Sequence, residues 1–345
     1  MGLNLAVIGL GRWGPNHVRN FDAIPGCQVV AAADPVEATR KRLAQGFPRV
    51  AMVADYREVL ARPDVQAVVV ATPTATHNEI VRAALLAGKH VLCEKPLTNR
   101  SADAWALARL AEEQQRVLMV GHVFLFNAGV VYLAKYLHGQ EAGRPYYVNA
   151  VRTNLGPFRY DVNAAWDLAS HDIYIINHLL QQRPVGVTAV GGSYLNAPIE
   201  DIVFLTLHYA DGLLGHIHVS WLDPRKVRTL TVVGEKKMIT WDEFGVPGPI
   251  MIHDRSVVKD TTYNTFGEFQ LLAREGDVIL PRVPMAEPLA AQARHFVDLC
   301  ADKIPADDQR GRPRQGAEVV DILEASARSL AARGARVDIV YGDHA

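Results

Sequence analysis

The sequence GLGRWG at positions 9–14 constrains the fold of this chain more than any other segment. It follows the apolar run Leu5–Ile8 and precedes a stretch with helical periodicity. Glycines at these spacings allow a tight turn, a close approach of backbone to a pyrophosphate, and close packing of a helix on a sheet. The free N–H groups at the helix N-terminus favour a phosphate at the same place. The segment alone also fits a plain glycine-rich turn.

An acidic residue at the end of the next strand strengthens the prediction. The apolar run Val29–Ala33 ends at Asp34, twenty residues after Gly14. A carboxylate there would accept hydrogen bonds from the adenosine ribose diol and repel a 2′-phosphate, so we predict NAD rather than NADP. The basic cluster 40–42 is a counter-argument, but we expect it on the exposed face of the next helix. Flavin is disfavoured because no second flavin-type motif follows.

The first third of the chain alternates apolar strands with helices, which is typical of a doubly wound parallel α/β fold. Beyond about residue 121 the pattern changes to alternating antiparallel strands, with a hairpin turn at Asp211-Gly212, followed by helices. We therefore predict a nucleotide-binding domain over residues 1–122 and a C-terminal α+β domain over 123–345. The expected strands are 5–8, 29–33, 67–71, 90–93, 117–120, 202–209, 215–221 and 228–233. The expected helices are 15–21, 37–45, 78–87, 101–114, 288–300 and 315–332.

Composition excludes several classes of protein. With 36 Lys+Arg against 37 Asp+Glu, the chain has no basic patch for nucleic acid or an anionic membrane. The three isolated cysteines, Cys27, Cys93 and Cys300, indicate neither a disulfide framework nor a zinc site. No targeting segment is apparent, and the uncharged stretch 117–134 is interpreted as strand, loop and helix. We expect a cytoplasmic protein.

Two further segments lie at the carboxyl edge of the predicted parallel sheet, where ligands bind in such folds. Thr72-Pro73 begins a helix with free amides and hydroxyls, and His77 follows one turn later, although it could be an ordinary solvent-facing histidine. Glu94-Lys95-Pro96 ends another strand, which directs Lys95 toward the same crevice, although a Lys-Pro pair is often only a loop.

The second half contains one candidate catalytic pair. Asp167 and His171 are four residues apart, so on a helix they share a face. Helix capping by Asp167 or Ser170 is the alternative. His216 and His218 alternate on a strand, but no carboxylate or cysteine completes a site, so we expect no metal.

Together these motifs resemble the glucose–fructose oxidoreductase, inositol dehydrogenase and MocA (Gfo/Idh/MocA) family of NAD(P)-dependent sugar and polyol oxidoreductases. The resemblance covers nearly the whole chain. It implies a Rossmann domain followed by a domain with a large open, mostly antiparallel sheet. One face of that sheet would close the active site and the other would form a homo-oligomer, a dimer or tetramer. It also implies a cis peptide before Pro96. The residues expected at the cofactor are Gly9, Gly11, Arg12, Trp13, Gly14, Asp34, Thr72, Pro73, His77, Glu94, Lys95 and Pro96.

The resemblance implies catalytic roles for Lys95, Asp167 and His171, and elementary chemistry agrees. An imidazole with a pKa near about 6.5 suits the base that takes a hydroxyl proton at neutral pH. A lysine cation favours a developing alkoxide, and Asp167 would orient the substrate or His171.

Within the family, residues 151–180 look most like a branch that oxidises nucleotide sugars at the 3-hydroxyl. We therefore predict oxidation of a UDP-linked N-acetylhexosamine or its uronic acid. The expected substrate residues are His122, Asn127, Arg152, Asn154, Arg159 and Asn163, with the arginines on the diphosphate. Either arginine could instead form an ion pair within the protein. The alternatives are a dehydrogenase of inositol or a free sugar, and a non-catalytic NAD sensor.

Overall fold

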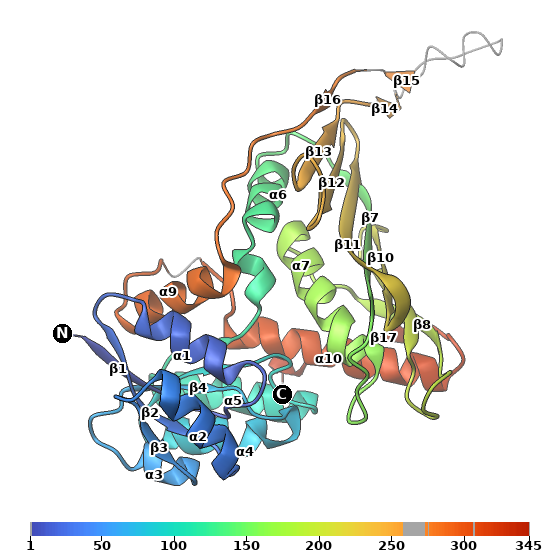
Figure 1. The fold of residues 1–345 in the computed structure, drawn as a ribbon. Helices are drawn as coiled ribbons and strands as arrows, with labels where there is room; N and C mark the ends of the chain where they lie inside the picture. Colours follow the sequence, from blue (N-terminus) through green and yellow to red (C-terminus); the bar gives the residue numbers. More distant parts are fainter. Residues whose placement is uncertain (1, 258–272, 275, 306–307, 345) are drawn as a thin grey trace, which may run out of the picture. The chain divides into compact units, whose positions relative to one another are not determined.

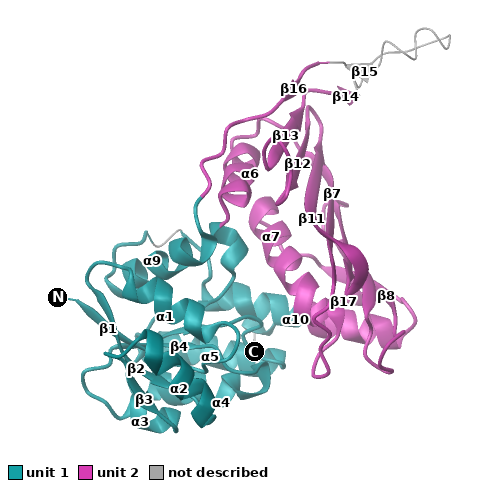
Figure 2. Cartoon of the chain, viewed as in Figure 1, with its two compact units in different colours: residues 1–126, 286–321, 341–345 teal, residues 127–285, 322–340 magenta. Residues whose placement is uncertain are grey.

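The computed structural model describes residues 2–257, 273–274, 276–305 and 308–344 (Figure 1). They form two compact units (Figure 2). The first comprises the described residues within 1–126, 286–321 and 341–345, and the second comprises those within 127–285 and 322–340.

A six-stranded parallel sheet with the order β3-β2-β1-β4-β5-β6 forms the centre of the first unit. Its strands β1, β4, β5 and β6 are largely buried on both faces, which explains their almost uniformly apolar sequences. From β1 the chain adds β2 and β3 on one side, and then returns to add β4, β5 and β6 on the other side. This strand order is that of a doubly wound Rossmann fold. The strands are β1 (Leu3–Ile8), β2 (Cys27–Ala33), β3 (Ala51–Val53), β4 (Ala67–Val70), β5 (His90–Cys93) and β6 (Leu118–Val120).

Helices connect these strands and cover the sheet. Helices α1 and α2 follow β1 and β2, whereas α4 and α5 follow β4 and β5 and pack on each other. The helices are α1 (Gly14–Asp22), α2 (Glu37–Gly46), α3 (Tyr56–Leu60), α4 (His77–Leu86), α5 (Ser101–Glu113) and α9 (Pro288–Cys300), with short helical turns η1 (Thr74–Thr76), η2 (Val123–Phe126) and η4 (Gly342–His344). Phe296 of α9 meets Phe21 of α1 edge-on, with ring centroids 6.0 Å apart, so α9 belongs to this core.

The second unit contains a nine-stranded sheet with the order β16-β13-β12-β11-β7-β10-β9-β8-β17. All its pairs are antiparallel except β7 with β10. The strands are β7 (Pro145–Leu155), β8 (Gly186–Gly192), β9 (Ile202–His208), β10 (Leu214–Ser220), β11 (Leu222–Gly234), β12 (Met238–Asp242), β13 (Ile250–His253), β16 (Val278–Ile279) and β17 (Val337–Asp338). A separate pair is formed by β14 (Ser256–Val257) and β15 (Ala273–Arg274). The predicted hairpin turn at Asp211-Gly212 is confirmed, because β9 and β10 flank it and pair antiparallel.

Helices α6 (Ala128–His138) and α7 (Ser170–Leu180) lie on the same face of this sheet, packed against β12 and β7 (Figure 1). The turn η3 (Ala165–Ala169) leads into α7 and has π-helical hydrogen bonds. The predicted fold class, a parallel doubly wound domain followed by an α+β domain with a mostly antiparallel sheet, is confirmed.

The compact units do not follow a single division of the chain at residue 122. Residues 286–321 return to the first unit, and helix α10 (Pro313–Ala331) contributes to both. In the first unit, Asp321 of α10 accepts hydrogen bonds from Ser101 and from the indole of Trp105. In the second, Ser329 accepts a hydrogen bond from the backbone of Ala189. The division into domains 1–122 and 123–345 stays a prediction.

Candidate functional site

The glycine loop between β1 and α1 has the geometry that a dinucleotide requires. Gly9 has a φ of +91°, and a Cβ there would lie 2.6 Å from the carbonyl oxygen of Ala71. A Cβ on Gly14 would overlap the carbonyl oxygen of Gly9. Around Gly11, in contrast, a Cβ would meet nothing within 4 Å. The loop is therefore closed toward the sheet and open at Gly11, where a pyrophosphate would approach the backbone. Arg12 and Trp13 are exposed beside it.

Asp34 connects the end of β2 to this loop. Its Oδ2 accepts a hydrogen bond from the Leu10 amide, and its Oδ1 accepts one from the Val36 amide, both at 2.8 Å. Each carboxylate oxygen has a second lone pair, which fits the expected bond from a ribose hydroxyl. The residues present therefore fit a bound dinucleotide.

The expectation for the basic cluster 40–42 was only partly correct. Lys41 and Arg42 are exposed on α2. Arg40 instead turns back to β2, because its guanidinium donates to the backbone carbonyls of Asp34, at 2.6 Å, and Pro35, at 3.0 Å.

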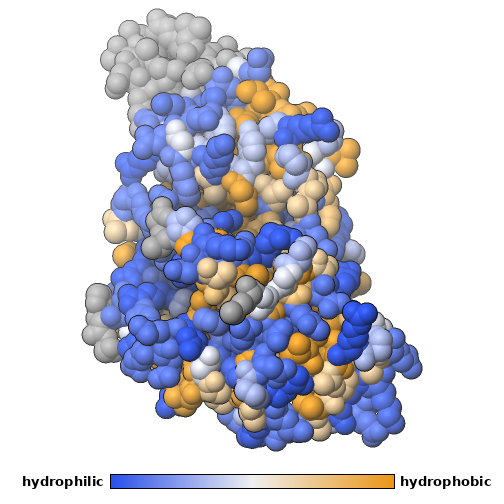
Figure 3. Space-filling view, turned by 90° about the vertical axis from the view of Figure 1, so that its left-hand side faces the viewer, coloured by the Kyte–Doolittle hydropathy of each residue, from blue (hydrophilic) through white to orange (hydrophobic). Residues whose placement is uncertain are grey.

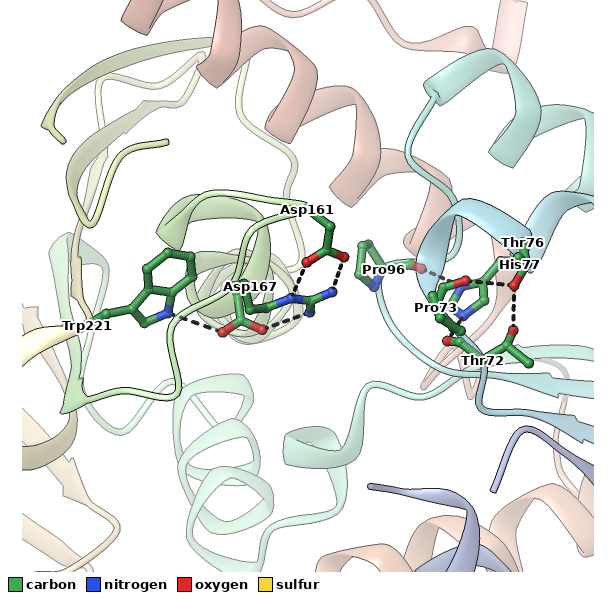
Figure 4. Close-up of polar contacts among 9 residues, drawn as sticks. Thr72, Pro73, Thr76, His77, Pro96, Asp161, Asp167 and Trp221 are labelled. Atoms are coloured by element: carbon green, nitrogen blue, oxygen red, sulfur yellow. Dashed lines mark hydrogen bonds and ion pairs between the residues drawn. The ribbon is translucent and has the colours of Figure 1, made fainter. Parts of the chain in front are cut away.

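His77 does not lie on the solvent side of α4, as the alternative interpretation had it. It is 1% exposed, and both ring nitrogens face backbone carbonyls (Figure 4). Nδ1 lies 3.0 Å from the Pro96 oxygen and Nε2 lies 2.9 Å from the Thr72 oxygen. Burial lowers the pKa of His77, and these carbonyls oppose that shift. His77 thus fastens the loop after β4 to the loop after β5, and its expected contact with the cofactor stays a prediction.

The hydroxyl of Thr76 lies 2.8 Å from both the Thr72 hydroxyl and the Pro73 carbonyl oxygen, which orders the start of η1 (Figure 4). The cis peptide implied before Pro96 is confirmed. Cofactor contacts of Thr72, Pro73 and Pro96 stay predictions.

Glu94 and Lys95 end β5 at the carboxyl edge of the parallel sheet. Oε1 of Glu94 lies 2.7 Å from Nε2 of His17, and Oε2 accepts the Lys95 backbone N–H at 3.3 Å. Burial by itself raises the pKa of Glu94, but the hydrogen bond and charge of His17, and then the charge of Lys95, outweigh it and hold that pKa below its ordinary value. Glu94 is therefore an ionised group at neutral pH.

His122 follows β6 and is 1% exposed. Burial, with a further contribution from the Lys95 cation, lowers its pKa to about 3. The imidazole is neutral throughout the physiological range. Its expected contact with substrate stays a prediction.

In the second unit, the Asp167 carboxylate lies between two side chains (Figure 4). The Trp221 indole donates to Oδ2 at 3.3 Å, and Nη1 of Arg159 lies 3.3 Å from Oδ1. Asn163 supports the same turn, because its Oδ1 accepts the backbone N–H of Trp166. His171 lies one turn later on α7, with Nδ1 3.0 Å from the Tyr174 hydroxyl.

The two arginines expected on a diphosphate occupy different environments. Arg152 is 1% exposed and makes a two-pronged ion pair with Asp172, with both bonds at 2.8 Å. This agrees with the alternative of an ion pair within the protein, because a diphosphate would have to replace a buried carboxylate; the substrate contact of Arg152 stays a prediction. Arg159 is half-buried and makes a two-pronged pair with Asp161, at 2.9 and 2.6 Å, which lowers the pKa of Asp161.

The expected asparagines also have partners within the protein. Asn127 caps α6, its Oδ1 accepting the amides of Gly129 and Val130. The Asn154 amide donates to the Gly156 carbonyl, and the Asn163 amide donates to Glu200 at 2.7 Å. Substrate contacts of these three residues stay predictions.

Sequence reasoning missed His17 and Trp221. His17 lies one turn into the helix that the glycine loop opens, so its face toward the sheet was a usable signal. Trp221 follows β10, and only the tertiary structure brings it to Asp167.

No cluster of three or more His, Cys, Asp or Glu side chains suited to a metal occurs among the described residues. The rings of His216 and His218 stack on Phe204, with centroids 6.4 and 4.5 Å away.

No helix within the described ranges is long and apolar enough to cross a membrane. The face drawn in Figure 3 is predominantly hydrophilic, with hydrophobic residues gathered in limited areas.

The strand order, the opening at Gly11 and the acid at the end of β2 define a dinucleotide-binding α/β protein. A family model described as the oxidoreductase family with an NAD-binding Rossmann fold matches residues 3–122. The model of the GFO/IDH/MocA C-terminal domain matches residues 130–240. The chain belongs to the GFO/IDH/MocA oxidoreductase family, and the expected cofactor, NAD, agrees with that description.

Individual relatives differ in their substrates. The inositol 2-dehydrogenase of Mycolicibacterium gilvum is 33% identical over 192 residues, 54% of this chain and 55% of that protein. The UDP-N-acetylglucosamine 3-dehydrogenase of Acidithiobacillus ferrooxidans is 33% identical over 196 residues, 55% of this chain and 58% of that protein. The chain thus matches little more than half the length of these two relatives. The crystal structure of GenD2 from gentamicin A biosynthesis, in complex with NAD, has a TM-score of 0.82 at 27% identity, covering 98% of this chain and 97% of that chain.

Proposed function

We propose that the protein is an NAD-dependent dehydrogenase that oxidises a secondary hydroxyl of a sugar. The observation that carries the proposal is the oriented Asp167 carboxylate, which the Trp221 indole and Arg159 hold one helical turn before His171. A carboxylate with this fixed orientation is suited to accept a hydrogen bond from a substrate hydroxyl. Bound NAD would supply the acceptor for the hydride.

The roles of the three catalytic candidates follow from their chemistry. His171 takes the hydroxyl proton as general base. The Lys95 cation favours the developing alkoxide. Asp167 orients the hydroxyl. A non-catalytic NAD sensor would need none of the three, so their presence together supports an enzyme.

We further propose a UDP-linked N-acetylhexosamine, or its uronic acid, as substrate, oxidised at the 3-hydroxyl. The support is Arg159, whose planar guanidinium could exchange Asp161 for a phosphate of similar geometry. The burial of Arg152 with Asp172 removes the second arginine from this argument. That burial favours the alternative, an inositol or free-sugar dehydrogenase, because an uncharged polyol needs no arginine.

A direct substrate comparison tests the proposal. UDP-N-acetylglucosamine, its uronic acid, myo-inositol and glucose are each incubated with NAD, NADH is followed at its absorbance band, and products are identified by mass spectrometry. A 3-keto nucleotide sugar supports the proposal. Good turnover of myo-inositol or glucose with none of the nucleotide sugars establishes the alternative, and no turnover with NAD still bound favours the sensor.

Variants test the catalytic roles. His171→Asn and Lys95→Met should each lower turnover by roughly 10²–10⁴, the usual contribution of a placed proton-transfer group. His138→Asn and Lys135→Met change residues of the same types on the exposed side of α6 and should leave turnover unchanged. Near-normal turnover in His171→Asn and Lys95→Met would remove the proposed roles.

We also propose that the chain acts in the cytoplasm as a homo-oligomer, a dimer or tetramer. The support is two cross-strand pairs of exposed apolar side chains on the nine-stranded sheet, Tyr147 with Leu214 and Val190 with Phe204. Light scattering coupled to gel filtration tests this, and a monomer at micromolar concentration would contradict it.

A further inference from the structure

A buried histidine on α1 is linked to the catalytic-lysine segment. His17 is 1% exposed, and its Nε2 lies 2.7 Å from Oε1 of Glu94. The two residues are 77 positions apart in the sequence. The contact joins the helix that the glycine loop opens to the residue that precedes Lys95. Nothing in the proposed chemistry uses His17.

The geometry defines the hydrogen bonds of this pair. Nδ1 of His17 is buried and has no hydrogen-bond partner among the described residues, so the ring reaches Glu94 through Nε2 alone. An ionised carboxylate only accepts hydrogen bonds, so Nε2 carries a proton. Nε2 then donates to Glu94, and Oε2 of the same carboxylate accepts the Lys95 amide. Both carboxylate oxygens are therefore held, one from α1 and one from the segment after β5.

The surroundings leave little freedom for this carboxylate. A Cβ added to Gly121 would lie 3.2 Å from Oε2 of Glu94, so the chain after β6 passes directly beside it. The side chain of Glu94 is 12% exposed. A carboxylate in such a position needs its partners, because a buried unpaired charge is costly.

We propose that His17 is a positioning residue for Lys95, acting through Glu94. By holding the carboxylate ionised and in one orientation, His17 fixes the backbone of Lys95 and keeps a negative charge next to its ammonium group. The cofactor-binding helix and the catalytic lysine are thereby coupled within one unit. The inference rests on the proposed catalytic role of Lys95.

The charges around Glu94 indicate what loss of His17 would do. Glu94 interacts with His17 from α1, with Cys93 and Lys95 of its own segment, and with His77 from α4. Burial raises the pKa of Glu94, and His17 provides the largest opposing effect. Without His17, Glu94 takes up a proton at higher pH. In the pH range where Glu94 is neutral, the Lys95 ammonium loses a favourable neighbouring charge and its backbone loses an oriented acceptor.

The test compares His17→Leu, which has no donor, with His17→Gln, which keeps an N–H donor. Turnover is measured from pH 5 to 9 with NAD and whichever of UDP-N-acetylglucosamine and myo-inositol the wild type oxidises. We expect His17→Leu to lose about tenfold to hundredfold in kcat, the range for a hydrogen bond to a charged group. The acid limb of its pH–turnover profile should move to higher pH. Its KM for NAD should stay within about threefold of the wild-type value. His17→Gln should restore most of the rate.

A second readout does not require turnover. Lysines are labelled by reductive ¹³C-methylation, the Lys95 signal is identified by its loss in Lys95→Arg, and its titration is followed by NMR. The inflection that Glu94 imposes on the Lys95 signal should move to higher pH by at least about half a pH unit in His17→Leu and not in His17→Gln. If the wild type oxidises neither substrate, the proposed function fails, and this titration still decides the inference.

Two outcomes overturn the inference. The first is that His17→Leu has the same pH profile and the same Lys95 titration as the wild type. The other is an equal defect in His17→Gln and His17→Leu, which would assign His17 to packing alone. Should His17→Leu fail to fold, Glu94→Gln makes the same comparison, because it removes the charge with little change in shape. An unchanged Lys95 midpoint in Glu94→Gln also overturns the inference.

Discussion

The buried His122 makes a specific prediction about stability at mildly acid pH. Its side chain is 1% exposed, and burial followed by the charge of Lys95 lowers its pKa from 6.5 to about 3. Between these two values the unfolded chain binds a proton at this residue and the folded chain does not. The unfolded state is therefore favoured as the pH falls, and stability rises with pH in this window. The stability that the neutral His122 contributes is fully present above pH 6.5 and is lost progressively as the pH falls toward about 3.

The magnitude follows from proton linkage. At pH 5 the unfolded histidine, with a pKa of 6.5, is almost fully protonated, while the folded one, with a pKa of about 3, is almost entirely neutral. The free energy of unfolding then falls by about 2 kcal/mol between pH 7 and pH 5, at about 1.4 kcal/mol for each unit of pH well below 6.5. This is a substantial part of the 5–15 kcal/mol that is usual for a folded domain, to order of magnitude.

Urea unfolding of the wild type and of His122→Gln at pH 7 and pH 5 measures the effect. Other buried histidines, including His77 and His295, have lowered pKa values and add to the dependence in both proteins. The difference between the two proteins isolates His122. His122→Gln should lose about 2 kcal/mol less than the wild type over this range, whatever its stability at pH 7. Equal losses would show that His122 is not buried and neutral in the folded protein.

Three further predictions concern the cofactor loop and the buried ion pair. NAD should bind more tightly than NADP in a direct titration because Asp34 repels a 2′-phosphate, and equal or tighter binding of NADP would contradict this. Gly11→Ala should melt like the wild type without cofactor but bind NAD poorly, whereas Gly14→Ala, whose Cβ would overlap Gly9, should lower the melting temperature itself. Arg152→Met should cost about 3–5 kcal/mol in urea unfolding by leaving Asp172 buried and unpaired, and adding Asp172→Leu should restore part of it.

The core strands of the parallel sheet were predictable because burial on both faces leaves an unambiguous apolar run. Strand β3 and helix α3 were missed, since three and five residues are too short to show a period. The helical pattern of α9 gave its bounds, Pro288–Cys300. It could not indicate that α9 packs on α1, because an apolar stripe identifies the buried face of a helix but not its partner.

The candidate site shows the same distinction between local and tertiary information. The glycine loop and Asp34 are determined by one strand–turn–helix unit, so their arrangement could be predicted from spacing. The partners of charged side chains could not be predicted from spacing. Arg152 pairs with Asp172, twenty residues later, only because β7 and α7 pack together. The contacts by which His77 holds two loops together also come from segments that are not adjacent in the sequence.

Several of the polar groups that we assign to binding or catalysis are held by a side chain from another element. His17 holds Glu94, and the Trp221 indole holds Asp167. Such partners fix the orientation of a charge before substrate binds, which reduces the reorganisation required during the reaction. Arg159 differs, because it divides its donors between Asp161 and Asp167 and so remains able to exchange a partner. An anionic substrate would compete for Arg159, whereas an uncharged polyol would leave both contacts intact. The substrate class therefore determines whether the orientation of Asp167 depends on what is bound.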